Sequence, residues 1–363
     1  MAYSVKSKAV SPLRSATALH KGGGQKCETQ LSLMRHSPME RVFSGEYPPF
    51  LELPSRPDDD RIPPGMKTSR YSRRQFFARS AAVGSLLIAS DALPVESLPV
   101  KRTAVDQVTL GRTGIRLSRL GFGTGSDSGH IQRNLGREAF NSLIHYAFDR
   151  GITYFDCAQA YSTFEWMAGA LKGLPREKLF IQSKVDHRPD DILGVIDHHR
   201  KVFDTDYVDS LLIHCMVSKN WPETWKGVRD GFDQAQERKW IRAKGVSCHS
   251  LPALSDATES DWPQVHLVRV NPQGAFMDGP DEHVNMANHP TGPVLQQLAV
   301  MRAKGRGVIG MKMIGNGTFV DAEEREKSLR FAMSRPELDA VVVGFKSRAE
   351  IDEAIERINS ALA

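Results

Sequence analysis

Residues 151–161 form the stretch on which the interpretation of the chain rests, with the sequence Gly151-Ile152-Thr153-Tyr154-Phe155-Asp156-Cys157-Ala158-Gln159-Ala160-Tyr161. Its apolar start predicts a short buried strand, which ends at Asp156 and is followed by a loop that carries Tyr161. Two further apolar strands are expected downstream, and they end at Lys184 and His214. If these strands are parallel neighbours, all four ionisable side chains leave the same edge of the sheet.

The four residue types suit one kind of chemistry. A free phenol has a pKa of about 10 and is a weak acid at neutral pH. The ammonium of Lys184 is expected to lower the pKa of Tyr161, and Asp156 is expected to hold that ammonium in place. Tyr161 could then give a proton to a developing alkoxide, while His214 orients a carbonyl oxygen. Taken singly, each of the four also has a structural explanation, such as a helix cap or a core histidine.

Together these residues resemble the aldo-keto reductase family, in a divergent bacterial branch. The family pattern is F-D-x-A-x-x-Y, followed by a lysine that closes the third strand and a histidine that closes the fourth. Asp156, Tyr161, Lys184 and His214 match it one for one, and the resemblance extends over roughly residues 107–361. It implies that Tyr161 is the proton donor, that Lys184 held by Asp156 lowers its pKa, and that His214 orients the substrate.

Short apolar strands alternate with helices eight times along the chain, and one of the helices is expected at residues 223–239. A hairpin is predicted before them, with its turn at Gly111-Arg112-Thr113-Gly114. We therefore predict an α/β fold, a (β/α)8 TIM barrel with an N-terminal β-hairpin, over residues 104–363. A doubly wound open sheet is the alternative, but the glycine-rich phosphate turn that it needs is missing. The glycine-rich segment 121–125 is expected to let a ligand approach the backbone closely.

The resemblance also implies that a nicotinamide dinucleotide binds at the same edge. NADP(H) is favoured, with NAD(H) as the alternative, because Lys346 and Arg348 stand beside a helix N-terminus, where a 2′-phosphate is well accommodated. The residues predicted to bind the cofactor are Ser247, Met311, Lys312, Gly344, Phe345, Lys346, Ser347, Arg348 and Glu353.

Within this set, the resemblance assigns Ser247 to the nicotinamide carboxamide and Glu353 to the adenine end, and Lys312 is expected to reach the pyrophosphate. Two positions depart from the family pattern. Met311 stands where the family often has a stacking aromatic residue. The sixth strand runs through Leu267-Val268-Arg269-Val270, where the family tends to have a glutamine.

The N-terminal part of the chain differs from the rest. Residues 1–65 have few apolar runs and are predicted to be a disordered extension, which would lie upstream of the true start if translation begins at Met66. Residues 66–103 are predicted to be a twin-arginine-type signal and linker, because Ser72-Arg73-Arg74-Gln75-Phe76 precedes an apolar stretch. Small residues suit cleavage after Ala92. We expect export to the periplasm by the twin-arginine machinery, and a cytoplasmic location if the signal is not used.

The charge distribution limits the partners. The formal net charge of +5 lies entirely in residues 1–100, so the rest is formally neutral and no nucleic-acid partner is expected. The apolar stretch 81–89 is too short to span a bilayer as a stable helix. No histidine pair has zinc-ligand spacing, and no metal site is predicted. The expected partner is a small-molecule carbonyl substrate, and the oligomeric state is left open.

The sequence thus predicts an NAD(P)H-dependent oxidoreductase that reduces an aldehyde or ketone to an alcohol. A nucleotide-binding sensor or accessory subunit with little turnover stays open, because Met311 replaces the stacking aromatic residue. The intact set of four catalytic residues argues against that alternative. A hydrolase or lyase on the same barrel is disfavoured, because no carboxylate pair or metal cluster stands out in the sequence.

Overall fold

The computed structural model describes residues 102–284 and 286–363. The predicted disordered extension and the twin-arginine-type signal therefore lie outside the described residues, apart from Arg102 and Thr103 at the end of the linker, and both interpretations stay predictions. Among the described helices, none combines the length and the apolar character that a bilayer crossing requires.

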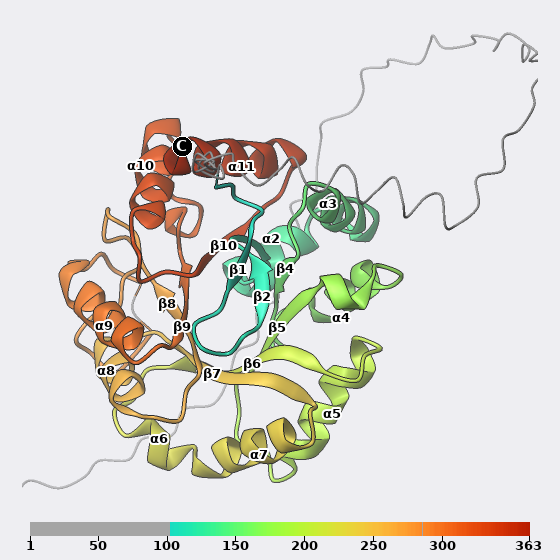
Figure 1. The fold of residues 1–363 in the computed structure, drawn as a ribbon, viewed down its shortest axis with the longest axis vertical. Helices are drawn as coiled ribbons and strands as arrows, with labels where there is room; N and C mark the ends of the chain where they lie inside the picture. The colour runs from blue at the N-terminus through green and yellow to red at the C-terminus, as the bar shows by residue number, and fades with distance from the viewer. Residues whose placement is uncertain (1–101, 285) are drawn as a thin grey trace, which may run out of the picture. The chain divides into compact units, whose positions relative to one another are not determined.

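Eight parallel strands close into a barrel in the order β10-β3-β4-β5-β6-β7-β8-β9 (Figure 1). This architecture confirms the predicted TIM barrel. The strands are β3 (Leu120–Gly123), β4 (Tyr154–Asp156), β5 (Phe180–Val185), β6 (Val208–Met216), β7 (Ile241–Cys248), β8 (Val265–Arg269), β9 (Gly307–Met311) and β10 (Ala340–Gly344). Because helices return the chain to the start of each following strand, all the carboxyl ends meet at one end of the barrel.

Helices surround the barrel in Figure 1. They are α2 (His130–Arg133), α3 (Arg137–Asp149), α4 (Phe164–Leu171), α5 (Ile192–Val202), α6 (Trp221–Thr224), α7 (Lys226–Glu237), α8 (Leu251–Glu259), α9 (Gly292–Ala303), α10 (Ala322–Met333) and α11 (Arg348–Leu362). The single helix predicted over residues 223–239 is in fact two, because the backbone at Trp225, with φ −106° and ψ 18°, is not helical. The short helix α2 was not predicted.

The predicted hairpin is also confirmed. Strands β1 (Gln107–Thr109) and β2 (Arg116–Ser118) pair antiparallel, and Figure 1 shows them lying across one end of the barrel. Leu110, Ile115 and Leu117 are buried in one cluster with interior side chains of the barrel strands. Burial of each such side chain contributes about 1.5–3 kcal/mol, so the hairpin stabilises the amino-terminal end of the barrel.

Side chains inside the barrel change character from one end to the other. Along β5 the two-residue period of a strand points Phe180, Gln182 and Lys184 inward. Phe180 belongs to the interior apolar cluster, Gln182 Nε2 donates to the Tyr154 hydroxyl at 2.8 Å, and Lys184 binds Asp156. The apolar layer thus fills the end under the hairpin, and ionisable groups occupy the carboxyl end.

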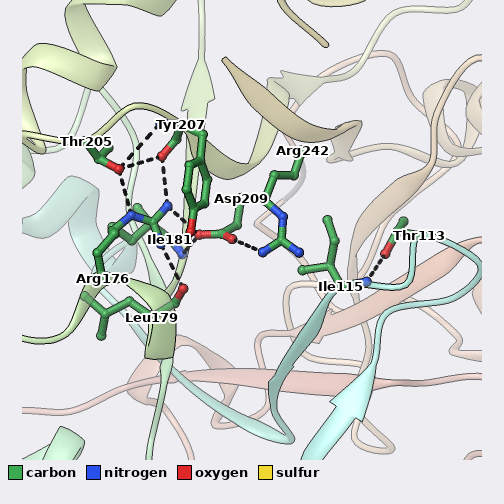
Figure 2. A network of polar contacts seen from close by, with 9 residues as sticks. All are labelled: Thr113, Ile115, Arg176, Leu179, Ile181, Thr205, Tyr207, Asp209 and Arg242. Carbon is green, nitrogen blue, oxygen red and sulfur yellow. Dashed lines mark hydrogen bonds and ion pairs between the residues drawn. The ribbon is translucent and has the colours of Figure 1, made fainter. Parts of the chain in front are cut away.

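A buried carboxylate, Asp209, joins three strands near their amino-terminal ends (Figure 2). It accepts hydrogen bonds of 2.7 Å from Arg176 and from Arg242, and of 3.0 Å from the backbone N–H of Ile181. The Arg176 guanidinium also lies 4.1 Å from the Tyr207 ring centroid. With its side chain 1% exposed, Asp209 is a structural anchor near the amino-terminal end of β6, the strand that carries His214 near its other end.

Candidate active site

Lys184 and Asp156 form a buried ion pair at the carboxyl ends of β5 and β4. Lys184 Nζ donates to both Asp156 oxygens, at 2.7 and 2.8 Å, and to the carbonyl oxygen of Cys157 at 2.7 Å. Gln182 Nε2 donates to Asp156 Oδ1 at 2.8 Å. Burial lowers the pKa of Lys184, but Asp156 outweighs this and the net pKa is raised. The site therefore holds an ammonium that three oxygen atoms fix in place.

Tyr161 lies between this ammonium and His214. Lys184 Nζ is 5.1 Å from the ring centroid of Tyr161, and the Tyr161 hydroxyl is 3.3 Å from His214 Nε2. Burial raises the pKa of Tyr161 to about 12, although Lys184 acts to lower it. Lys184 thus acts on this pKa in the expected direction, but the net pKa is raised, because burial penalises the phenolate more than Lys184 stabilises it.

Gly125 provides the space for that hydroxyl. A Cβ atom on Gly125 would lie 2.7 Å from the Tyr161 oxygen. The segment 121–125 was expected to admit a ligand, and at this position it is the tyrosine side chain that comes close to the backbone. The loop that follows β3 is joined to the Tyr161 loop by a 2.9 Å hydrogen bond from Ser162 N to Ser128 O.

A β-bulge directs His214. Ile213 pairs with Val246 and Met216 pairs with Cys248, so two residues of β6, His214 and Cys215, stand opposite one residue of β7. Cys215 has a φ of +60°, which marks the bulge. Burial, together with the charge of Lys184, lowers the pKa of His214 to about 3. His214 is therefore a neutral hydrogen-bonding group at physiological pH.

A second polar chain, which the sequence analysis did not assign, lies beside His214. The His249 ring is 6.4 Å from the His214 ring, its Nε2 is 3.2 Å from Ser247 Oγ, and its Nδ1 contacts Arg269 Nη2. Arg269 Nε is 3.6 Å from Asp278 Oδ1. In the sequence, these polar contacts were indicated only by Arg269, which stands where the family tends to have a glutamine.

Asp278 lies in the long loop after β8 and is 0% exposed. Neither of its oxygens has a hydrogen-bond partner among the described residues. Burial raises the pKa of Asp278 to about 7, although Arg269 acts to lower it. Nothing in the spacing of the sequence marks this acid as buried, because its neighbours Asp281 and Glu282 are exposed.

Three predicted cofactor residues stand at the ends of β7 and β9. Ser247 is buried, and Met311 and Lys312 are half-buried. Lys312 has a φ of +64°, and its Nζ donates to Asn316 Oδ1 at 2.9 Å. Burial and the repulsion of Arg269 lower the pKa of Lys312 to about 8. No carboxylate among the described residues forms an ion pair with Lys312 within 4.0 Å, so this ammonium is not neutralised by the protein.

Three more predicted cofactor residues, Gly344, Phe345 and Lys346, lie at the end of β10 and in the loop before α11. Gly344 is exposed, whereas the Phe345 ring is buried against Phe122 with the ring centroids 5.4 Å apart. Phe345 can therefore meet a ligand through its backbone alone. Lys346 has a side chain 65% exposed and contacts Glu350 at 3.8 Å.

The remaining three lie on α11 itself. The Ser347 side chain caps this helix by accepting a 3.2 Å hydrogen bond from Glu350 N. Arg348 Nη2 donates to Ser142 Oγ at 2.8 Å, which directs it toward α3. Glu353 accepts hydrogen bonds of 2.8 Å from Arg325 and from Arg357. Arg348 and Glu353 are thus engaged within the protein, and the structure does not bring them together with Lys312 and Ser247.

Comparison with known families agrees with this geometry. The model of the aldo/keto reductase family matches residues 119–360, and the chain therefore belongs to that family. It is 31% identical over 156 residues to the NAD/NADP-dependent indole-3-acetaldehyde reductase of Schizosaccharomyces pombe, a match that covers 40% of this chain and 52% of that protein. It is 27% identical over 172 residues to the 9,11-endoperoxide prostaglandin H2 reductase of Trypanosoma cruzi, covering 46% and 56%. The chain thus spans about half the length of these curated relatives.

Solved structures share the fold. A putative aldo-keto reductase from Pseudomonas aeruginosa matches with a TM-score of 0.57 and 19% identity, over 72% of this chain and 98% of that one. The holo form of aldo-keto reductase AKR11C1 from Bacillus halodurans matches with a TM-score of 0.57 and 13% identity, over 71% and 95%. At these identities the likeness establishes the barrel and its topology.

Proposed function

We propose that the protein reduces an aldehyde or ketone to the alcohol, with NADPH or NADH as the hydride donor. The observation that carries the proposal is the position of Tyr161, whose hydroxyl is 3.3 Å from His214 Nε2 and whose ring is 5.1 Å from the Lys184 ammonium. Membership of the aldo/keto reductase family and the nicotinamide dependence named for the fission-yeast relative support it.

Each of the four residues has one role in this proposal. Tyr161 keeps its proton at neutral pH, since its pKa is about 12, and gives it to the carbonyl oxygen as that oxygen gains charge. The Lys184 ammonium then stabilises the phenolate that is left, and Asp156 holds the ammonium in place. Neutral His214 orients the carbonyl oxygen.

The described residues fit a nicotinamide dinucleotide, which supplies the hydride when bound. The half-buried Lys312 ammonium has no carboxylate partner within the described part of the chain and suits a pyrophosphate. The exposed ammonium of Lys346 beside the start of α11 suits a further phosphate, which favours NADPH over NADH. Ser247, buried at the end of β7, would hold the carboxamide. Arg348 and Glu353 keep their predicted roles only if they exchange their present protein partners for the cofactor.

The test is NADPH oxidation by the purified protein with a panel of aldehydes and ketones, including indole-3-acetaldehyde, followed by the absorbance of the reduced nicotinamide. Tyr161→Phe should lower kcat by about 10²–10⁴-fold, because it removes the proton donor and keeps the ring. Turnover of Tyr161→Phe at the wild-type rate would overturn this mechanism. Tight NADPH binding without turnover of any carbonyl compound would instead favour the sensor or accessory subunit.

We also propose that the twin-arginine-type signal exports the folded protein, with the cofactor loaded before export. The support is the order of the arginine pair, apolar stretch and small residues near Ala92 in the sequence. Cell fractionation tests this, with Arg73→Lys/Arg74→Lys as the comparison. Equal amounts of both proteins in the periplasmic fraction would contradict the proposed route.

A further inference from the structure

A cavity of about 270 Å³ opens at the end of the barrel opposite to Tyr161. Its position follows from the residues that line it. Arg119 directly precedes β3 and Asp339 directly precedes β10, so both mark the amino-terminal ends of barrel strands. Tyr161, by contrast, follows the carboxyl end of β4. The cavity is therefore separate from the candidate active site.

Four arginines line this cavity, namely Arg102, Arg119, Arg302 and Arg335. The one acidic residue that lines it, Asp339, already has partners. Its oxygens accept hydrogen bonds of 2.9 Å from Gly111 N, 3.0 Å from Val308 N and 3.0 Å from Arg302. Asp339 therefore neutralises Arg302 and fixes the hairpin, and it forms no ion pair within 4.0 Å with the other three guanidinium groups.

The other three arginines are only partly compensated by the protein. Arg119 Nε donates to the carbonyl oxygen of Thr103 at 3.2 Å, and the Arg335 guanidinium lies 4.6 Å from the Phe331 ring centroid. Arg119 lies 4.0 Å from Asp106, which also accepts two short hydrogen bonds from Thr103. Arg102 and Arg335 form no ion pair with any residue that the structure describes. Arg335 Nε is buried and has no hydrogen-bond partner there either. With Asp106 set against Arg119, about two positive charges remain unmatched around the cavity.

Repulsion within the cluster is visible at Arg119. Burial lowers its pKa from the usual value, Arg102 lowers it further, and Asp106 opposes both effects. Arginines near helix C-termini are often explained by the helix dipole alone, and this applies to Arg302 in the last turn of α9 and to Arg335 just after α10. Arg102 and Arg119 belong to neither helix, so the dipole does not explain why all four meet at one cavity.

The rest of the wall is largely apolar. Val108 of the hairpin, Met333 at the end of α10, and Leu338 and Val341 around the start of β10 line it together with the arginines. A ligand that satisfies both parts of the wall carries a doubly charged oxyanion on a small hydrocarbon body. Guanidinium groups match the geometry of a phosphate with paired N–H donors.

We propose that this cavity is a binding site for a small phosphate monoester, held by Arg102, Arg119 and Arg335. The phosphate supplies the two negative charges that the cluster lacks, and the organic part packs on the half-buried side chains of Val108 and Leu338. A ligand bound at this end of the barrel would leave the catalytic centre open. The proposal does not depend on the proposed reductase function.

The test is calorimetric titration of the full chain with phenyl phosphate, with inorganic phosphate as the second probe and phenol as the uncharged one. Arg102→Gln/Arg335→Gln is the informative variant, because neither arginine has a carboxylate partner that its loss would expose. We expect the double variant to bind phenyl phosphate at least about tenfold more weakly, and phenol not to bind. Arg330→Gln, which removes one positive charge from α10 outside the cavity, should bind like the wild type.

Thermal unfolding gives a second measurement. Without phosphate the double variant should unfold at about the same temperature as the wild type, because the relief of repulsion offsets the loss of the Arg335 contacts with Phe331 and with the end of α10. Phenyl phosphate should raise the unfolding temperature of the wild type alone. If inorganic phosphate binds as tightly as phenyl phosphate, the proposal of a monoester ligand is overturned and the site is one for free phosphate. No binding of either probe, or binding that Arg102→Gln/Arg335→Gln leaves unchanged, would overturn the site itself.

Discussion

The Lys184 ammonium lies 2.7 and 2.8 Å from the two carboxylate oxygens of Asp156, and both side chains are buried. This pair fixes a positive charge next to Tyr161 before any substrate arrives. The ammonium also donates to the carbonyl oxygen of Cys157 at 2.7 Å, so three oxygen atoms hold it in place. Its charge acts to lower the pKa of Tyr161.

Asp156→Asn should expose the cost of burying that charge. Removing one partner of a buried pair leaves the other uncompensated, and we expect the free energy of unfolding to fall by about 3 kcal/mol. The raised pKa of Lys184 means that the pair stabilises the fold below the usual lysine pKa and that this contribution is lost as the pH rises through the raised value. Urea unfolding at neutral pH measures the loss. An unchanged free energy of unfolding would show that the pair gives no net stability.

Gly125→Ala should impair catalysis without unfolding the protein. The added methyl group would lie 2.7 Å from the Tyr161 oxygen, so the hydroxyl must move away from His214. A displacement of the hydroxyl by about 1 Å is expected to lower kcat by about a hundredfold. Gly227→Ala in α7 is the matched control, because a Cβ atom there meets nothing within 4 Å. Comparable kcat values for the two variants would argue against a positioning role for Gly125.

The eightfold alternation of apolar strands and helices was enough to predict the barrel, and the ionisable residues at the strand ends were enough to predict the meeting of Asp156, Tyr161, Lys184 and His214. They were enough because parallel strands bring their carboxyl ends together whatever the details of packing. The bulge at His214 depends on the register between two strands, and local sequence does not encode that register. The raised pKa of Tyr161 depends on burial, which the identity of its charged neighbours does not reveal.

The position of Arg348 shows the same limit at the cofactor end. The basic loop before α11 is evident from the sequence, but the partner of each basic side chain depends on the tertiary structure. Arg348 binds Ser142 and lies 4.9 Å from the Tyr146 ring, whereas Lys346 extends into solvent. Asp278 is a further case, because one acid in an otherwise exposed acidic loop is carried into the interior to meet Arg269.

Asp278→Asn should change how stability depends on pH. Because burial raises its folded pKa to about 7, the stabilising contribution of Asp278 is present below its ordinary pKa of 3.8 and is lost as the pH rises toward about 7. The free energy of unfolding of Asp278→Asn, relative to the wild type, should therefore improve between about pH 4 and pH 7. Urea unfolding across this range checks it, with Asp281→Asn in the exposed part of the loop as control. A difference that stays constant with pH would mean that Asp278 titrates as an ordinary carboxyl.

Lys346→Gln should weaken the binding of NADPH but not that of NADH. The exposed ammonium beside the start of α11 is placed to meet a 2′-phosphate, and a charge-assisted hydrogen bond of this kind is worth about tenfold in Kd. We expect fluorescence titration to show weaker binding of NADPH and unchanged binding of NADH. Arg348→Gln should have a smaller effect, because that guanidinium is already engaged with Ser142 and Tyr146. If Arg348→Gln weakens NADPH as much as Lys346→Gln does, Arg348 must leave α3 when the cofactor binds, and the phosphate site is built from both residues.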